Sequence, residues 1–206
     1  MTVHRKKNWF LTIAFALGIL AHAVLAAPGP SSPSKTYRIS PSYTTLSFTA
    51  TKWEVFKEEG IFHDFSGTLT YDPANPAGCA IDVTVQSASL DTRNDTRDQV
   101  LRSDDFFDVA KYPTLSFRSA AIAPTASGAY DVTGDLTIHG ITRRITVPAK
   151  LIGARAMPGI GDFAGFETTF TIDRRDYGVL GTRWSGNTLA IEPAIVLHLI
   201  IGGVRQ

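Results

Sequence analysis

Cysteine is almost absent from this sequence of 206 residues, since Cys79 is the only one. A single thiol cannot form an internal disulfide, so a disulfide-stabilised fold is excluded and a hydrophobic core must hold the protein together. No Cys-x-x-Cys pair surrounds Cys79, which we interpret as a small buried residue and not as a reactive thiol.

An excess of charge of either sign is also missing. The chain has 20 Lys and Arg residues against 19 Asp and Glu, a formal net charge of +1. A near-neutral chain gives no electrostatic reason to expect a nucleic-acid partner.

Catalytic motifs are equally scarce. The sequence has no Gly-x-Ser-x-Gly elbow, no phosphate-binding glycine loop and no His-Glu-x-x-His pair. His63, His139 and His198 are far apart and lack metal-ligand spacing, and His198 interrupts an apolar run that predicts a buried imidazole. We therefore predict no catalytic residue, no metal site and no enzymatic activity.

Long hydrophobic runs are limited to one, at the N-terminus. The cations of Arg5-Lys6-Lys7 precede an apolar run from Phe10 to Leu25, and Val24-Leu25-Ala26 offers small side chains where a signal peptidase reads. This predicts a signal peptide at 1–26, a flexible Pro- and Ser-rich leader at 27–35, and export to the periplasm. An uncleaved anchor is the alternative, although the run is short for the roughly 20 residues that span a bilayer.

What the sequence does have is alternation of apolar and polar residues. Leu69 and Tyr71 share one parity of their run, as do Leu136 and Ile138 of theirs. Period two is typical of strands with one apolar face, and turns rich in Pro, Asn and Gly separate the runs. The pattern predicts an all-β sandwich or barrel over residues 36–206.

Two segments depart from this pattern. Residues 94–103 contain good helix formers after an N-capping Asn94, so we predict a short helix over an open end of the β-structure. Residues 195–201 are apolar on both parities, which indicates a covered outer face and a homodimer through this C-terminal strand.

Several blocks, in this order along the chain, resemble the YceI family. They lie at 65–69, 89–92, Leu101-Arg102-Ser103-Asp104-Asp105-Phe106-Phe107-Asp108, Tyr112-Pro113-Thr114-Leu115-Ser116-Phe117, Gly134-Asp135-Leu136-Thr137-Ile138-His139-Gly140 and 173–178. The resemblance implies a lipocalin-like antiparallel β-barrel of about eight strands, with a short helix at the barrel mouth. It also implies a long internal tunnel for polyisoprenoid or related amphiphilic lipids, and many members are periplasmic.

The aromatic residues of the chain suit such a tunnel. An eight-stranded barrel is just wide enough to hold one slim ligand or to be filled by its own side chains. The alternative, in which the aromatics pack on one another and fill the barrel, stays open at this stage. We predict as tunnel-lining residues Phe48, Trp53, Phe65, Leu101, Phe106, Phe117, Ile138, Phe170 and Trp184.

Arginines near the predicted helix are candidates for a lipid head group. Arg93 and Arg97 lie beside several aspartates, and Arg174 begins the late Arg-Arg-Asp-Tyr-Gly element. A guanidinium binds phosphate through paired hydrogen bonds. The alternative is that these arginines pair with aspartates on a solvated helix face.

The sequence therefore predicts a periplasmic carrier or binding protein for a long isoprenoid or a quinone, with no other cofactor. The alternative is a secreted interaction module that docks a transient membrane or redox partner and has no lipid ligand.

Overall fold

The computed structural model describes residues 34–182 and 191–205. The chain divides into two compact units, Met1–Pro30 and Ser31–Gln206, and every described residue lies in the second. The predicted signal peptide and all but the end of the predicted leader lie outside the described residues. Among the residues described, no helix is long and apolar enough to cross a membrane.

In the described chain, one sheet contains 11 strands, and one α-helix, α1 (Asp95–Arg102), lies outside the sheet. The strands are β1 (Lys35–Ile39), β2 (Thr45–Lys52), β3 (Phe56–Phe62), β4 (Phe65–Tyr71), β5 (Ala80–Gln86), β6 (Leu90–Asp91), β7 (Thr114–Pro124), β8 (Tyr130–Ile138), β9 (Ile141–Met157), β10 (Gly161–Asp173) and β11 (Ile191–Arg205). Short 3-10 turns include η1 (Pro41–Tyr43) and η4 (Arg174–Tyr177).

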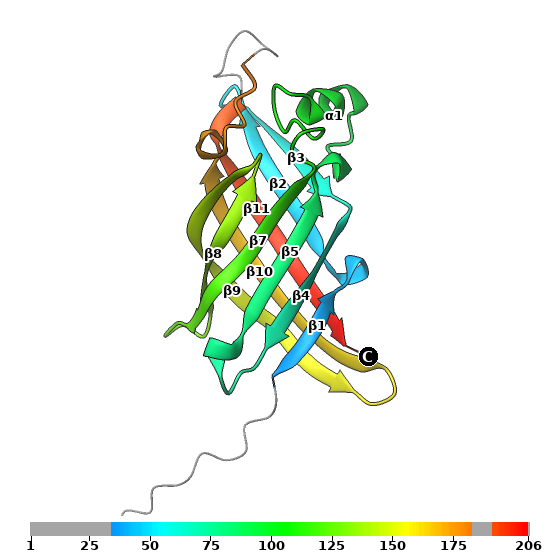
Figure 1. Ribbon diagram of the computed structural model, residues 1–206, viewed down its shortest axis with the longest axis vertical. Coiled ribbons are helices and arrows are strands. Elements are labelled where there is room, and N and C mark those ends of the chain that lie inside the picture. Colours follow the sequence, from blue (N-terminus) through cyan, green and yellow to red (C-terminus); the bar gives the residue numbers. More distant parts are fainter. Residues whose placement is uncertain (1–33, 183–190, 206) are drawn as a thin grey trace, which may run out of the picture. The chain divides into compact units, whose positions relative to one another are not determined.

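The sheet closes into a barrel because β1 pairs with β11, through Arg38 with Val204 and Ile39 with Gly203. The ring runs β1-β4-β5-β7-β8-β9-β10-β11, and each pair of neighbours is antiparallel (Figure 1). The predicted eight-stranded antiparallel barrel is therefore confirmed.

Three positions around the ring are occupied by broken strands. At each of them two short strands follow one another along the chain. These pairs are β1 with β2, which both pair with the same edge of β11, then β3 with β4, and β5 with β6. Each position therefore pairs with the next one along the chain, as in an up-and-down barrel. The breaks let β2, β3 and β6 extend the wall beyond the ring on one side.

The two ends of the barrel differ in what covers them. The helix end carries α1, η4 and the turns Trp53–Val55 and His139–Gly140, whereas the far end carries the loops 72–79, 125–129 and 158–160 (Figure 1). Asn94 caps α1, since its side chain accepts a hydrogen bond from the Arg97 backbone N–H at 3.0 Å. The predicted helix over an open end is confirmed.

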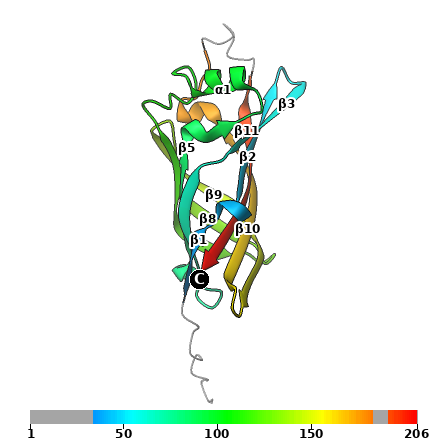
Figure 2. The ribbon, with the colours of Figure 1, turned by 90° about the vertical axis from the view of Figure 1, so that its right-hand side faces the viewer.

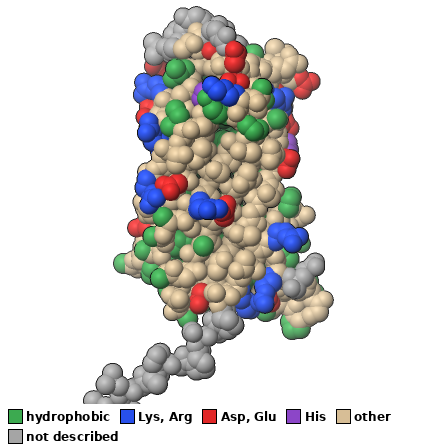
Figure 3. Space-filling view, in the orientation of Figure 1, with side chains coloured by type: hydrophobic (Ala, Val, Ile, Leu, Met, Phe, Trp, Pro, Cys, Tyr) green, Lys and Arg blue, Asp and Glu red, His purple; other side chains and the backbone are tan. Residues whose placement is uncertain are grey.

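Alternation along the strands separates an apolar interior from a polar outer wall. In β8, Val132, Gly134, Leu136 and Ile138 are buried and the residues that alternate with them are more exposed. The outer wall carries cross-strand ion pairs such as Arg144 with Asp135 at 2.6 Å. On the face that Figure 3 shows, side chains of both charges are interspersed.

One predicted burial in β11 is wrong. Leu197 and Leu199 face the interior, but His198 between them is exposed, with its Nδ1 2.8 Å from the Thr169 hydroxyl oxygen. Strand period turns residue 198 outward, whatever the hydrophobicity of its neighbours. The homodimer through this strand stays a prediction.

Candidate functional site

The barrel interior contains two adjoining chambers. The far chamber, toward the loop 72–79, has a cavity volume of about 170 Å³, and the helix-end chamber has one of about 120 Å³. Both volumes count the space open to the centre of a water-sized sphere. One water molecule needs only about 10–15 Å³ on this measure. The interior is therefore hollow over both chambers and not filled by its own side chains.

Apolar side chains from most of the ring line the far chamber. Its lining includes Leu69, Ile81, Val83, Phe117, Val132, Leu136, Val147, Phe166, Phe170 and Leu199. The hydroxyls of Tyr71, which is buried, and Tyr130, which is half-buried, lie 3.4 Å apart in this lining and bond to each other. Burial, together with this hydrogen bond, raises the pKa of Tyr71 above its usual range. The far chamber is suited to a hydrocarbon chain.

Aromatic rings crowd the extreme far end. Tyr71 and Phe166 have ring centroids 5.3 Å apart, and Tyr130 and Phe166 are 6.1 Å apart. Cys79 packs in the same buried cluster, and burial raises the pKa of its thiol. The interpretation of Cys79 as a small buried residue is confirmed.

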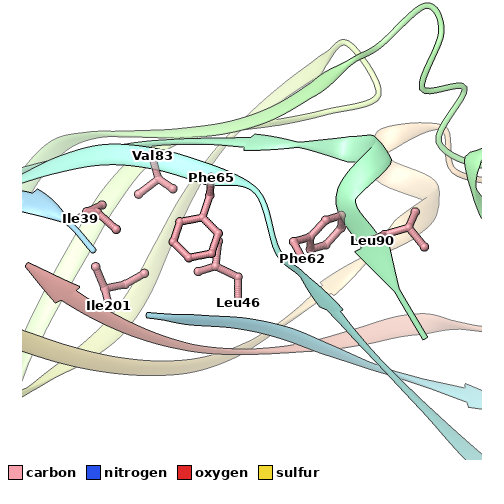
Figure 4. Packing of buried hydrophobic residues seen from close by; sticks show 7 residues of the cluster. All are labelled: Ile39, Leu46, Phe62, Phe65, Val83, Leu90 and Ile201. Atoms are coloured by element: carbon pink, nitrogen blue, oxygen red, sulfur yellow. The ribbon is translucent and has the colours of Figure 1, made fainter. Parts of the chain in front are cut away.

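The two chambers adjoin at a set of shared side chains, which we call the neck. Four side chains line both of them: Phe62, Leu115, Ile138 and Leu197. Phe62 also belongs to a cluster with Phe65 and Leu46 where the broken strands meet (Figure 4). A long ligand that occupies both chambers has to pass these four residues.

The helix-end chamber has a polar rim. Lys52, Glu58, Thr92 and Arg97 contribute to its lining beside Val100, Leu101 and Phe106. The Arg97 guanidinium pairs with Glu58 of β3, and it donates to the Thr92 hydroxyl at 2.7 Å and the Thr92 carbonyl at 2.7 Å. Arg97 therefore connects the α1 segment to the barrel wall and places charge beside the chamber.

Arg174 also lines the helix-end chamber, but its donors are used by the backbone. It is buried, and it donates to the carbonyls of Val179 at 2.7 Å, Leu180 at 2.6 Å, Ile191 at 2.7 Å and Glu192 at 3.2 Å. Burial lowers the pKa of its guanidinium from the ordinary value. Its observed role is to hold η4, the segment after it and β11 together.

Aromatic rings lie against the wall instead of across the axis. A Cβ added to Gly60 would lie 2.3 Å from the Phe48 ring, and one added to Gly134 would lie 2.4 Å from the Phe117 ring. Gly181 and Phe106 stand in the same relation, at 2.3 Å. Glycine lets the tip of a ring approach the backbone closely. This explains how a barrel with many aromatics stays hollow.

The structure brings together most of the predicted lining residues. Phe117 and Phe170 line the far chamber, Phe48, Leu101 and Phe106 line the helix-end chamber, and Ile138 lines both. Phe65 is buried in the adjoining cluster, and Trp184 lies outside the described residues.

Two predicted positions need correction. Trp53 is 57% exposed at the turn between β2 and β3 and belongs to the lining of neither chamber. Arg93 lies on the outer surface, where its guanidinium is 3.7 Å from Glu59. Both residues sit in turns with positive φ that point their side chains away from the interior.

Sequence reasoning missed the neck residues Leu115 and Leu197, the Tyr71–Tyr130 pair and the rim residues Lys52 and Glu58. Strand parity would have placed Leu115 and Leu197 inward. No sequence signal identifies which inward residues meet across the barrel. In the described part of the chain, no three His, Cys, Asp or Glu side chains gather as a metal site would require.

Comparison with known proteins gives consistent matches. The family model of the YceI-like domain matches residues 37–200. A UPF0312 protein of Ectopseudomonas mendocina is 39% identical over 150 residues, which are 71% of this chain and 74% of that protein.

Among solved structures, Burkholderia cenocepacia BcnA matches with a TM-score of 0.72 and 26% identity, over 80% of this chain and 98% of that one. A polyisoprenoid binding domain from Saccharophagus degradans, implicated in plant cell wall breakdown, matches with a TM-score of 0.62 and 16% identity, over 82% and 98% of the two chains. The last match concerns the fold alone.

Proposed function

We propose that this chain, which belongs to the YceI-like domain family, binds one elongated apolar lipid in its barrel and carries or stores it without chemical change. The observation that carries the proposal is the hollow interior, with an apolar far chamber and a polar rim at the helix end. A lipid tail would occupy the far chamber and pass the neck, and its head group would lie beside α1.

The energetics favour a long tail. Each buried CH₂ group contributes about 0.8 kcal/mol, so ten such groups contribute about 8 kcal/mol before the entropic costs of binding. Apolar cavities of this kind stay dry and accept apolar guests. The far chamber therefore stabilises a hydrocarbon chain without any directed polar contact.

The charges at the rim favour an uncharged head group. Arg97 is paired with Glu58 and bonded to Thr92, and Arg174 donates to four carbonyls. A phosphate would have to approach the Glu58 carboxylate, whereas a hydroxyl or a quinone carbonyl carries no charge for that carboxylate to repel. Isoprenoid alcohols and quinones are accordingly the first lipids to test, as is also suggested by the polyisoprenoid-binding domain with the same fold.

The same features favour binding over catalysis. No described group of acid, base and nucleophile faces the interior together, and the polar side chains of the rim serve to join segments of the chain. We propose that the N-terminal 26 residues export the protein and that it carries its lipid in the periplasm.

Native mass spectrometry tests the proposal. Protein prepared without detergent is incubated with isoprenoid alcohols of increasing length and with a hydrophilic tripeptide as a control. We expect a one-to-one complex whose stability rises with chain length until both chambers are full. Absence of any complex at every length, with the protein folded, would contradict the proposal.

A further inference from the structure

Large apolar side chains are exposed at the turn between β2 and β3. Trp53 is 57% exposed, Val55 72% and Phe56 55%. The rings of Trp53 and Phe56 contact edge to face with centroids 6.3 Å apart. We call residues Lys52–Phe56 the hairpin tip, and Figure 2 shows it projecting from the barrel beside α1.

The backbone of the hairpin tip is unfavourable for these residues. The Val55 N–H donates to the Lys52 carbonyl at 3.1 Å, and the two residues between them have positive φ, 51° for Trp53 and 58° for Glu54. Such turns favour Asn and Gly, because a side chain in the left-handed region costs about 1 kcal/mol or more. The turn thus presents a tryptophan to solvent at a cost in stability, and strained residues of this kind concentrate at functional sites.

The hairpin tip lies at the mouth of the helix-end chamber. Lys52, the first residue of the tip, and Glu58, two residues after it, both line that chamber. The Lys52 ammonium lies 4.2 Å from the centre of the Trp53 ring, so the tip and the chamber share a residue. Leu180, which is 43% exposed, lies on the same rim. Arg174 donates to the carbonyls of both Leu180 and Ile191, and Ile191 is the strand partner of Lys52.

The charges around the tip do not oppose an anionic surface. The Glu58 and Glu59 carboxylates are paired with Arg97 and Arg93. Lys52 and Lys57 flank the exposed aromatics in the sequence, and these two cations outnumber Glu54, an exposed carboxylate within the hairpin tip. Tryptophan and lysine both carry an apolar body with a polar end, which suits the boundary between lipid tails and head groups.

We propose that the hairpin tip inserts into the head-group region of a lipid bilayer and holds the chamber mouth against the membrane. The proposal rests on the lipid-binding function for its purpose, since lipid could then move between bilayer and barrel with little exposure to water. A protein partner fits less well. The three exposed side chains offer on the order of 300 Å², whereas a stable interface buries about 800 Å² per partner.

Vesicles of phosphatidylethanolamine and phosphatidylglycerol with brominated acyl chains test the docking. Wild type and the double variant Trp53→Gly, Phe56→Thr are compared by co-sedimentation, all with the same N-terminus. Bromine quenching of tryptophan fluorescence is measured in wild type and the control variant, which both keep Trp53. Ile160→Thr is the matched control, because Ile160 is 66% exposed at the turn of the opposite end.

We expect the double variant to bind vesicles at least about tenfold more weakly, a loss of about 1.4 kcal/mol or more, while Ile160→Thr binds like wild type. Trp53→Gly relieves the positive φ, so the melting temperature should hold or rise, which a merely structural role of Trp53 would not produce.

Wild type that does not bind vesicles, or a double variant that binds equally, would overturn the docking. A wild-type dimer formed without vesicles and lost in the double variant would also overturn it, in favour of a second copy. Uptake of an isoprenoid alcohol from ethanol solution is measured separately. Uptake without vesicle binding contradicts the docking alone, whereas vesicle binding without uptake supports the docking and contradicts the lipid-binding function.

Discussion

The far chamber and the helix-end chamber share one barrel wall but are built differently. The far chamber lies inside the closed ring, where neighbouring strands bond to each other along their length. The helix-end chamber also has paired strands, β2, β3 and β11, in its wall. The α1 segment and η4 complete it through side chains such as Arg97 and Arg174. Its shape therefore depends in part on a few polar contacts, and that of the far chamber on the sheet.

This difference assigns separate roles to the two regions. An apolar chamber within a continuous sheet contributes binding free energy and little selectivity among tails. A chamber assembled partly from loops can open without breaking the ring, and its polar groups fix the orientation of a head group. Ligand exchange is expected at the helix end.

The largest effect is expected at Arg174. Arg174→Met leaves four carbonyl oxygens without their donor, and we expect the free energy of unfolding to fall by about 3 kcal/mol. Arg175→Met is the control, because Arg175 pairs with Asp173 on the surface and its loss should change the free energy of unfolding far less. Urea unfolding of both variants measures the difference. Equal losses would show that the helix end does not depend on these hydrogen bonds.

A block at the neck should separate the two chambers. Leu197→Trp places a larger side chain where both chambers meet, so a lipid tail is excluded from the far chamber. If four CH₂ groups lose their burial, binding weakens by about 3 kcal/mol, or roughly a hundredfold. Titration with a long and a short isoprenoid alcohol measures it, with Leu197→Met as the volume-matched control. A long alcohol that binds Leu197→Trp as it binds wild type would contradict the continuous interior.

A methyl group at Gly60 should shrink the helix-end chamber alone. The new Cβ would meet the Phe48 ring at 2.3 Å, so the ring has to tilt off the wall into the chamber. We expect lipid affinity to fall about tenfold, since one or two groups lose their space. Gly153→Ala is the control, because its Cβ would meet nothing within 4 Å. Isothermal titration compares the two, and equal affinities would refute the role of the ring–glycine contact.

The smallest effect concerns pH and the far chamber. Burial raises the pKa of Cys79, so the folded state keeps the thiol protonated where the unfolded chain ionises it, above about pH 9.0. The stability from the neutral thiol is present below that pH and is lost as pH rises through the folded pKa. Unfolding free energies of wild type and Cys79→Ala, measured across this range, should show a steeper decline for wild type. Parallel declines would place the thiol in contact with water.

The strands and the helix could be predicted because their determinants are local, whereas the choice of a barrel over a sandwich rested on the resemblance to the YceI family. Alternation in β8 and the capping of α1 by Asn94 are legible in a few consecutive residues. The breaks in the strands were not predicted, since they depend on pairing between residues far apart, as for β2 and β11.

Most of the aromatic lining of the candidate site was predicted from the sequence. The predictions failed at residues whose positions depend on backbone conformation or on backbone carbonyls. Trp53 has the hydrophobicity of an interior residue, but a positive φ at a turn carries it outward. Arg174 has the charge of a head-group ligand, yet its guanidinium donates to the carbonyls of Val179, Leu180, Ile191 and Glu192. Neither the turn conformation nor the path of those carbonyls leaves a pattern in side-chain type.

The central claim is that an apolar chain occupies the far chamber. A crystal structure with an isoprenoid alcohol that carries bromine at its tail end tests this directly, through the anomalous signal of the bromine. The account predicts a bromine peak inside the barrel, among Phe117, Leu136 and Val147. A peak on the outer surface, or side chains closed across the barrel axis, would contradict it.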